Sequence, residues 1–320
     1  MFVFILRRVL QAVPITVIVT MIVFIVMQMT PGNPMSAMIS PDVPPHEIVR
    51  RERQLGLDRP LYVQYVAWLR EVLRGNLGYS TKGGRQVGEM IRSRLGPTLL
   101  LAGTAIAVSF LVGVPIGVLS AVRRYSALDY ALTVFAFFGL SVPNFFFAIG
   151  LIYVFSVQLE WLPAMGLATI ASGYTGWALV ADHLRHLVLP VAVLSLSTLA
   201  TVVRFTRSAM LEVLAADYIR TADAKGLRPR VVVYRHALLN ALIPIITVLG
   251  LLLPFLFSGS FIVEAIFAWP GLGQLGVQSI FSRDYPVVMA INLFAALSVL
   301  AGSLIADVLY ALVDPRIRYE

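Results

Sequence analysis

Long apolar stretches alternate with short polar segments along the whole chain. Eight stretches contain no Asp, Glu, Lys or Arg: 9–41, 95–122, 130–159, 161–181, 186–203, 236–263, 265–282 and 285–306. A helix that crosses a bilayer needs about 20 mostly apolar residues. Gly, Pro and polar residues interrupt 161–181 and 265–282, so we assign these two to external loops and predict six membrane-spanning helices.

The distribution of basic residues predicts the orientation of the six helices. With the N-terminus inside, the short cytoplasmic segments hold thirteen basic residues, whereas the two short external loops hold only Arg185 and Arg283. Short cytoplasmic segments of membrane proteins are rich in Lys and Arg. The loop 30–96 exceeds the roughly 60-residue length over which this bias operates. We therefore predict that both termini and the segment 204–235 are cytoplasmic.

The composition narrows the class of protein. The chain is 58% hydrophobic and 13% charged, whereas soluble domains are about a quarter charged. It has no cysteine, which excludes disulfides and thiolate metal sites. Neither Lys82 nor Lys225 follows a glycine, so no Gly-x-x-x-x-Gly-Lys phosphate loop is present. This is a multi-pass membrane protein with no metal motif and no nucleotide-binding site of its own.

One polar segment, 204–244, separates two apolar stretches in the second half of the chain. Residues 210–225 contain no Gly or Pro and predict a helix, which Gly226 would end in a left-handed conformation. Pro229 fits the first turn of a second helix. The pattern is compatible with a solvated loop or with a helix that docks on a cytoplasmic partner.

Scattered polar residues inside the apolar stretches are candidates for the wall of a transport pathway. They are Ser141, Asn144, Ser195, Ser197, Thr198, Thr201 and Ser258. Each could instead form an ordinary hydrogen bond between helices. The ionisable residues Asp129, Glu264 and Asp307 all lie near the ends of predicted spans, which argues against a carrier driven by protons or sodium ions.

Several motifs resemble one family of membrane proteins. The segment Arg220, Thr221, Ala222, Asp223, Ala224, Lys225, Gly226 and Leu227 is similar to the cytoplasmic "EAA" loop of ABC-importer permeases, in the dipeptide and oligopeptide branch. Arg-Thr-Ala stands where the general motif has Glu-Ala-Ala, and the closing proline is Pro244 rather than a residue near Leu239. The resemblance continues through 75–80, 141–145, 263–273, 284–288 and 314–319, so it covers essentially the whole chain.

The resemblance implies an all-α, type I importer permease in a bacterial or archaeal inner membrane. A first helix (1–29) would precede an extracytoplasmic subdomain (30–96) and a five-helix core (97–320) with a coupling loop at 204–238. A second permease subunit would complete the pathway, two ATPase subunits with ATP and Mg²⁺ would dock on Arg220–Leu227, and a binding protein would deliver substrate. Glu264, Trp269 and Asp284 are candidates for an external gate or for contacts with the binding protein.

The resemblance implies a di- or oligopeptide as substrate, although close relatives handle nickel chelates or glutathione. The chain itself is expected to bind no cofactor and to catalyse no reaction. Two other classes stay open: a secondary carrier, which would need an inverted repeat and ion ligands at mid-depth, and a membrane adaptor that senses without transporting.

Overall fold

The described part of the chain is built from helices and the segments that connect them. The computed structural model describes residues 2–29, 58–258 and 261–313, and within these ranges it contains no β-strand. The elements are α1 (Phe2–Met29), α3 (Leu61–Leu73), α4 (Val87–Val122), α5 (Ala127–Ser141), α6 (Asn144–Leu151), the π-helix η2 (Ile152–Gln158), α7 (Gly176–Leu214), α8 (Asp217–Ala224), α9 (Pro229–Val231), the π-helix η3 (Val232–Ala237), α10 (Leu238–Ser258), α11 (Phe261–Ile266), α12 (Leu272–Ser282) and α13 (Tyr285–Val313).

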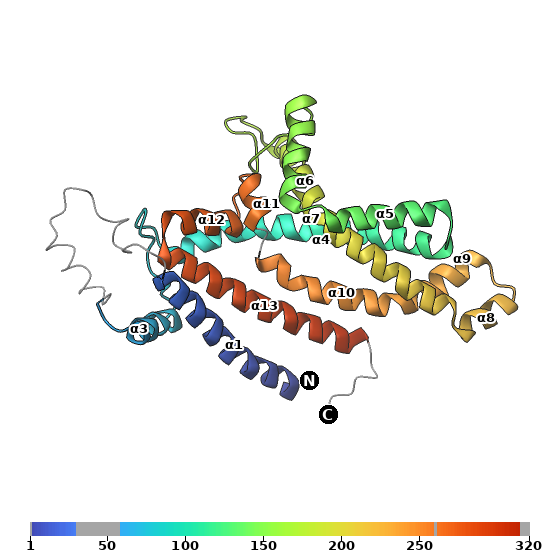
Figure 1. The fold of residues 1–320 in the computed structure, drawn as a ribbon, viewed down its shortest axis with the longest axis horizontal. Coiled ribbons are helices and arrows are strands. Elements are labelled where there is room, and N and C mark those ends of the chain that lie inside the picture. The colour runs from blue at the N-terminus through green and yellow to red at the C-terminus, as the bar shows by residue number, and fades with distance from the viewer. Residues whose placement is uncertain (1, 30–57, 259–260, 314–320) are drawn as a thin grey trace.

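The long helices lie along one common axis. In Figure 1, α1, α13, α10, α4 and α7 follow the long dimension of the molecule, with α8 and α9 at one end and α3 and α12 at the other. The helices α6 and η2 project sideways from this layer. We refer to the two ends of the layer as the α8 end and the α12 end.

Three helices in the described part of the chain are long and apolar enough to cross a membrane: Val87–Val122, Gly176–Leu214 and Tyr285–Ile305. The pair Ala127–Ser141 and Asn144–Gln158 would add a fourth span, but it is bent by 103°. In α1, the segment Val13–Met29 is a shorter apolar helix. The structure therefore supports a multi-span helical protein, and the number six stays a prediction.

The predicted span 130–159 is divided by a sharp bend between α5 and α6. Val142 has an extended conformation (φ −82°, ψ 123°), and so does Pro143 (φ −60°, ψ 132°). A residue before proline avoids the helical conformation, and proline has no N–H to continue a helix. Residues 142 and 143 together end α5 and start α6 in a new direction.

Small residues allow α4, α5 and α7 to pack closely. A Cβ atom added to Gly117 would lie 2.5 Å from Cβ of Thr206, and one added to Gly113 would lie 2.9 Å from Cγ1 of Val202. At Gly139 of α5, the added atom would lie 3.1 Å from Cγ of Leu196. Glycine in membrane helices lets backbones approach each other closely. The three helices therefore form a tight unit with α7 at its centre.

The α7–α8 region differs from the predicted helix at 210–225. Helix α7 continues to Leu214, and α8 begins separately at Asp217. The N–H groups of Ala215 and Ala216 donate to Glu212 O (3.2 Å) and Val213 O (3.0 Å), and Ala216 is then extended (φ −73°, ψ 148°). The prediction of one continuous helix is wrong because this break reorients α8 so that its apolar side can be buried.

The predicted external subdomain is partly described. Residues 30–57 of this subdomain lie outside the described residues. Residues 61–73 form α3, which packs on α1; Tyr65 is buried there and its hydroxyl lies 2.9 Å from Thr20 Oγ1. His186 is buried in α7, with Nδ1 2.8 Å from Asp182 O.

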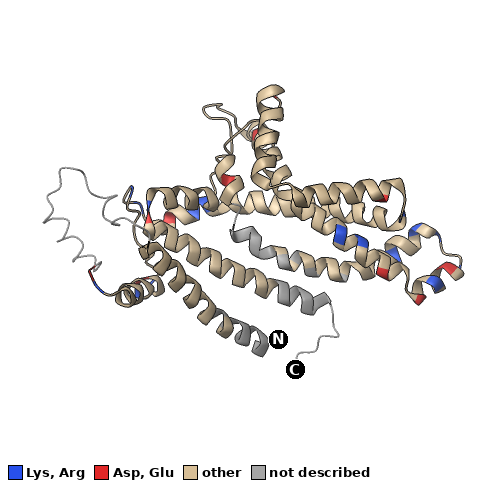
Figure 2. Ribbon diagram, in the orientation of Figure 1, with Lys and Arg blue, Asp and Glu red and all other residues tan. Residues whose placement is uncertain are grey.

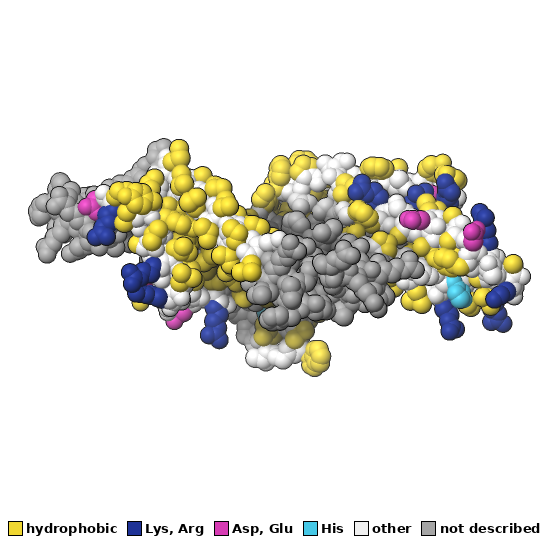
Figure 3. Space-filling view, turned by 90° about the horizontal axis from the view of Figure 1, so that it is seen from below, with side chains coloured by type: hydrophobic (Ala, Val, Ile, Leu, Met, Phe, Trp, Pro, Cys, Tyr) yellow, Lys and Arg dark blue, Asp and Glu magenta, His cyan; other side chains and the backbone are white. Residues whose placement is uncertain are grey.

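Charge and hydrophobicity are separated along the molecule. Figure 2 shows most charged residues near the α8 end and the α12 end. Figure 3 shows broad hydrophobic surface between charged side chains at the two ends. The exposed side chains of α1 include Leu10, Ile18, Ile22 and Val26. An apolar belt bounded by charged ends fits a protein that lies across a bilayer.

Candidate functional site

The first candidate site is α8 at one end of the molecule. The side chains of Ile219 and Ala222 face inward and join a buried cluster that we call the α8 cluster. It consists of Val118, Ala121, Ala209, Met210, Ile219, Ala222, Val232, Ala237 and Ala241. Because these residues come from α4, α7, α8, η3 and α10, one apolar cluster fixes α8 against three long helices and the π-helix η3.

The end of α8 has the geometry that Gly226 predicted. Gly226 has φ +71°, its N–H donates to Asp223 O (2.9 Å), and the N–H of Leu227 donates to Ala222 O (3.4 Å). These two bonds form a Schellman cap, which requires a left-handed residue at this position. Pro229 then occupies the first turn of α9, as predicted. The local conformation expected from the sequence is confirmed.

The outer face of α8 is open to a partner. Of the eight candidate coupling residues, only Ala222 is buried; Arg220, Thr221, Asp223, Ala224, Lys225, Gly226 and Leu227 are exposed. Tyr218, which lies just before the motif at 220–227 and was not among the candidate residues, is 48% exposed. Tyr218 lies three residues before Thr221 and seven before Lys225, a helical spacing that would have identified it. Exposed aromatic side chains are frequent anchors in protein interfaces.

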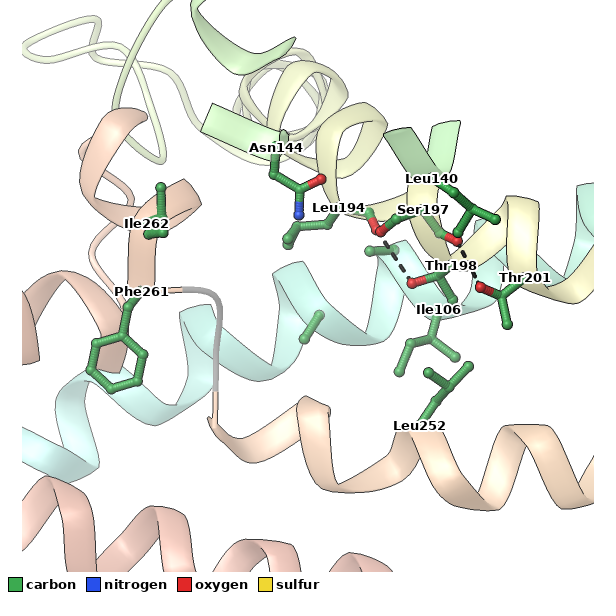
Figure 4. Close-up of a pocket in the computed structure, with 12 residues that line it drawn as sticks. Ile106, Leu140, Asn144, Leu194, Ser197, Thr198, Thr201, Leu252, Phe261 and Ile262 are labelled. Atoms are coloured by element: carbon green, nitrogen blue, oxygen red, sulfur yellow. Dashed lines mark hydrogen bonds between the residues drawn. The ribbon is translucent and has the colours of Figure 1, made fainter. Parts of the chain in front are cut away.

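The second candidate site is a chamber of about 530 Å³ between the helices. Its polar lining consists of Asn144 from α6 and of Ser197, Thr198 and Thr201 from α7 (Figure 4). Its apolar lining comes from α4, α5, α7, α10 and α11: Ala102, Ala105, Ile106, Leu140, Leu194, Leu252, Phe261 and Ile262. The chamber therefore presents hydroxyl and amide groups on an otherwise apolar, uncharged wall.

Two of the three hydroxyl groups that α7 contributes to the chamber are oriented by their own helix. Thr198 Oγ1 donates to Leu194 O (3.4 Å) and Thr201 Oγ1 donates to Ser197 O (3.0 Å). Each hydroxyl proton is directed to the backbone, so the oxygen lone pairs remain available as acceptors. Asn144 supplies two donors and one acceptor from the neighbouring helix. Together these groups can exchange hydrogen bonds with an uncharged amide backbone.

Not all the candidate pathway residues meet at the chamber. Four of them line it: Asn144, Ser197, Thr198 and Thr201. Ser141 is instead exposed on α5 and donates to Phe137 O (2.8 Å). Ser195 is buried on another side of α7, and its carbonyl accepts a bond from Ser109 Oγ (3.2 Å). The side chain of Ser258 lies outside the described residues. Ser195 therefore contributes to packing between α4 and α7.

The candidate residues at the α12 end are buried. Glu264 is 1% exposed, and its carboxylate accepts bonds from Thr98 Oγ1 (3.1 Å) and from the N–H groups of Gly273 (2.7 Å) and Gln274 (3.2 Å). A carboxylate at a helix N-terminus satisfies free N–H groups and complements the helix dipole. Glu264 therefore joins α4, α11 and the first turn of α12.

Trp269 and Asp284 also connect separate parts of the fold through buried side chains. Trp269 is fully buried and its indole N–H donates to Pro97 O (2.9 Å). Asp284 is 3% exposed; it accepts bonds from the Ser80 hydroxyl and from the N–H of Thr81 (3.1 Å), and so ties the segment after α3 to the corner before α13. The side chains of all three residues are buried in this conformation, and their assignment to an external gate or to contacts with the binding protein stays a prediction.

The comparisons with known proteins place the chain in a family. The model of the binding-protein-dependent transport system inner membrane component matches residues 113–319, and the model of the N-terminal part of such membrane components matches residues 1–102. The chain therefore belongs to the family of inner membrane components of binding-protein-dependent transport systems. It is an ABC-importer permease subunit and a multi-pass inner membrane protein.

Full-length relatives support this assignment. The chain is 44% identical to the oligopeptide transport system permease protein AppB of Bacillus subtilis over 317 residues, which is 99% of each chain. It is 39% identical to the glutathione transport system permease protein GsiC of Salmonella typhimurium, again over 99% of each chain. A solved structure of the MetNI methionine ABC transporter in an inward-facing conformation has the same fold, with a TM-score of 0.57, 20% identity, and 70% of this chain and 96% of that chain covered.

Proposed function

We propose that this chain forms half of the pathway through which an ATP-driven importer moves di- or oligopeptides across the inner membrane. The observation that carries the proposal is the chamber, whose lining has hydroxyl and amide groups and no charged side chain. Such a wall can bind the peptide backbone, which all peptides share, without selecting a particular side-chain charge. The names of the relatives, an oligopeptide and a glutathione permease, support the same substrate class.

The proposed assembly contains a second, homologous permease subunit, two ATPase subunits and an extracytoplasmic binding protein. In it, the chain has six spans with both termini in the cytoplasm, which places α8 on the cytoplasmic side and α12 on the opposite side. The exposed residues of α8 contact an ATPase subunit, and ATP and Mg²⁺ are bound by that partner. The chain itself binds no cofactor.

Transport requires the chamber to open alternately to the two sides of the membrane. Closure of the ATPase subunits on ATP displaces α8, and the α8 cluster passes this displacement to α4, α7 and α10, which line the chamber. Glu264, Trp269 and Asp284 hold the opposite end closed until the helices move. Two-state switching of packed helices is the usual form of such transitions.

The proposal predicts that the chain acts only with its partners. Reconstituted alone in liposomes, it should neither hydrolyse ATP nor pass peptide, and the full assembly should couple ATP hydrolysis to peptide uptake. The measurement is the accumulation of a radiolabelled tripeptide, with glutathione and a nickel chelate as competing substrates. Uptake driven by a proton gradient without any ATPase would contradict the proposal and support a secondary carrier. Preferential uptake of a nickel chelate would reassign the substrate.

A further inference from the structure

We propose that Arg207 and Asp129 are positioning residues that make α5 move together with α7 when α8 is displaced. The inference rests on the proposed function, because it concerns how the displacement of α8 reaches the chamber. Neither residue touches the chamber. Their role follows from where the ion pair lies between α8 and the chamber wall.

The carboxylate of Asp129 accepts hydrogen bonds from three parts of the fold. Asp129 lies in the first turn of α5 and is 2% exposed. It accepts bonds from Arg207 Nε (2.8 Å) and Nη2 (2.9 Å) on α7. The Ser120 hydroxyl on α4 and the N–H of Tyr125 in the α4–α5 corner (3.0 Å) also donate to it. The carboxylate thus joins α4, the corner and α7 at a single point.

The geometry of the pair makes it a stiff connection. Two parallel N–H···O bonds fix the guanidinium in the plane of the carboxylate, so neither group can rotate without breaking a bond. The pair is also largely shielded from water, since the side chain of Asp129 is 3% exposed and that of Arg207 is 27% exposed. Separating a buried ion pair leaves an uncompensated charge and is strongly unfavourable.

On one side, the pair is close to α8. Arg207 lies in the last two turns of α7, which ends at Leu214, and only Ala215 and Ala216 separate that end from α8. Met210, one turn after Arg207, belongs to the α8 cluster together with Ile219 of α8. A displacement of α8 therefore moves the part of α7 that carries Arg207.

On the other side, the pair leads to the chamber. Asp129 is in α5, whose last turn holds the chamber residue Leu140, and the bend at Pro143 then leads to Asn144. The other polar groups of the chamber, from Ser197 to Thr201, belong to α7 itself. The ion pair therefore ties the two helices that carry the polar wall. Without it, the close contact of Gly139 with Leu196 still joins α5 to α7 near the chamber, but the start of α5 is no longer held to the end of α7 that leads to α8.

Arg204 provides a matched control for Arg207. It lies one turn earlier on the same helix and carries the same charge, but it is exposed and stacks over the Phe205 ring (5.6 Å). The informative variant is Arg207→Lys, which keeps the charge and loses the two parallel bonds. Asp129→Asn removes the charge from the other partner. If the loss of a positive charge from α7 were enough to impair transport, Arg204→Gln would impair it too. If the ion pair is what matters, only the variants of Arg207 and Asp129 are impaired.

The test uses the full assembly in proteoliposomes, with peptide uptake and ATP hydrolysis measured together. For Arg207→Lys and for Asp129→Asn we expect the ATPase subunits to co-purify as in wild type, and peptide transported per ATP to fall by roughly two- to thirtyfold. We expect Arg204→Lys and Arg204→Gln to match wild type. The double variant should be no worse than either single variant, because the two residues act as one unit.

A second readout follows the movement directly. The chain has no native cysteine, so a spin label at Phe146→Cys reports on α6 alone. In wild type and in Arg204→Lys, ATP should change the spectrum of this label, and in Arg207→Lys that change should be lost. In a further chain, Asp129→Cys and Arg207→Cys are joined by a thiol cross-linker, and the spin label at position 146 is attached to a non-thiol amino acid. The cross-link should restore the response of the label to ATP.

The outcomes separate this inference from the proposed function. Equal transport per ATP and equal label responses in wild type and Arg207→Lys would overturn the inference and leave the ion pair as a static anchor. Loss of ATPase co-purification in Arg207→Lys would also overturn it, since the pair would then only support α8. Absence of peptide uptake in wild type, with an intact ATP response of the label, would instead reject the peptide substrate.

Discussion

At the scale of single residues, the conformation of Gly226 connects the sequence to α8. A positive φ of +71° is disfavoured for residues with a Cβ, and this position has no neighbouring heavy atom within 4 Å of an added Cβ. Any cost of substitution therefore comes from the backbone and not from crowding. A substitution at Gly226 therefore tests whether the conformation at the end of α8 matters for contact with the ATPase.

We predict that Gly226→Val weakens binding of the ATPase subunits or lowers transport per ATP, because the left-handed conformation costs a residue with a Cβ about 1–2 kcal/mol. Gly84→Val is the matched control, since Gly84 also has a positive φ (+62°) and open space around it, but lies at the α12 end. Co-purification of the ATPases and substrate-stimulated hydrolysis measure the effect. If both variants behave as wild type, α8 is not the coupling element.

At the scale of elements, the contact between α4 and α7 supports both candidate sites. The glycines of α4 let α7 approach closely, and the α8 cluster and the chamber both draw residues from these two helices. The tightest position is Gly117, where an added Cβ would also lie 2.9 Å from Val203 O. A backbone atom cannot move aside without moving its whole helix. A residue larger than glycine at position 117 would therefore strain the contact between α4 and α7.

We therefore predict that Gly117→Ala destabilises the protein by about 1–3 kcal/mol, the usual cost of overpacking. Gly150→Ala in α6 is the control, because nothing lies within 4 Å of an added Cβ there. Thermal unfolding in detergent, followed by circular dichroism, should show a lower midpoint for Gly117→Ala only. A Gly117→Ala midpoint equal to that of wild type would mean that α4 and α7 are less closely packed than described.

At the scale of the whole molecule, the orientation in the membrane decides which partners can reach which end. The described helices supply three or four candidate spans, and the charge pattern supplies the direction. The α8 end carries the basic residues expected on the cytoplasmic side. The prediction of six spans and cytoplasmic termini can be tested with single cysteines, since the chain has none of its own.

We predict that Lys82→Cys and Ser172→Cys react with an impermeant thiol reagent in cells whose outer barrier has been opened, and that Ala224→Cys reacts only after the inner membrane is permeabilised. Lys82 is preferred over its neighbour Ser80, which is buried and bonded to Asp284. Mass spectrometry of the labelled chain gives the result. Labelling of Ala224→Cys in intact cells would reverse the orientation and place α8 outside.

Many residues of the two candidate sites could be predicted from residue types and their spacing in the sequence. A polar side chain in an apolar stretch is visible in the sequence, and Leu194, Ser197, Thr198 and Thr201 follow the spacing of one helix face. The same spacing places Ser195 on another side of α7, where the structure buries it. The class of protein was evident because charge-free stretches of this length, together with a biased distribution of basic residues, are characteristic of multi-pass membrane proteins.

The sequence by itself determined the membrane class, the cap at Gly226 and the start of α9 at Pro229, because each depends on the composition or backbone preferences of a few adjacent residues. Only the tertiary structure decided the break before α8, the burial of Glu264 and Asp284, and the pairing of Asp129 with Arg207. These features depend on contacts between residues far apart in the chain: the break is set by the cluster that receives Ile219, and the ion pair joins residues 129 and 207 across two packed helices.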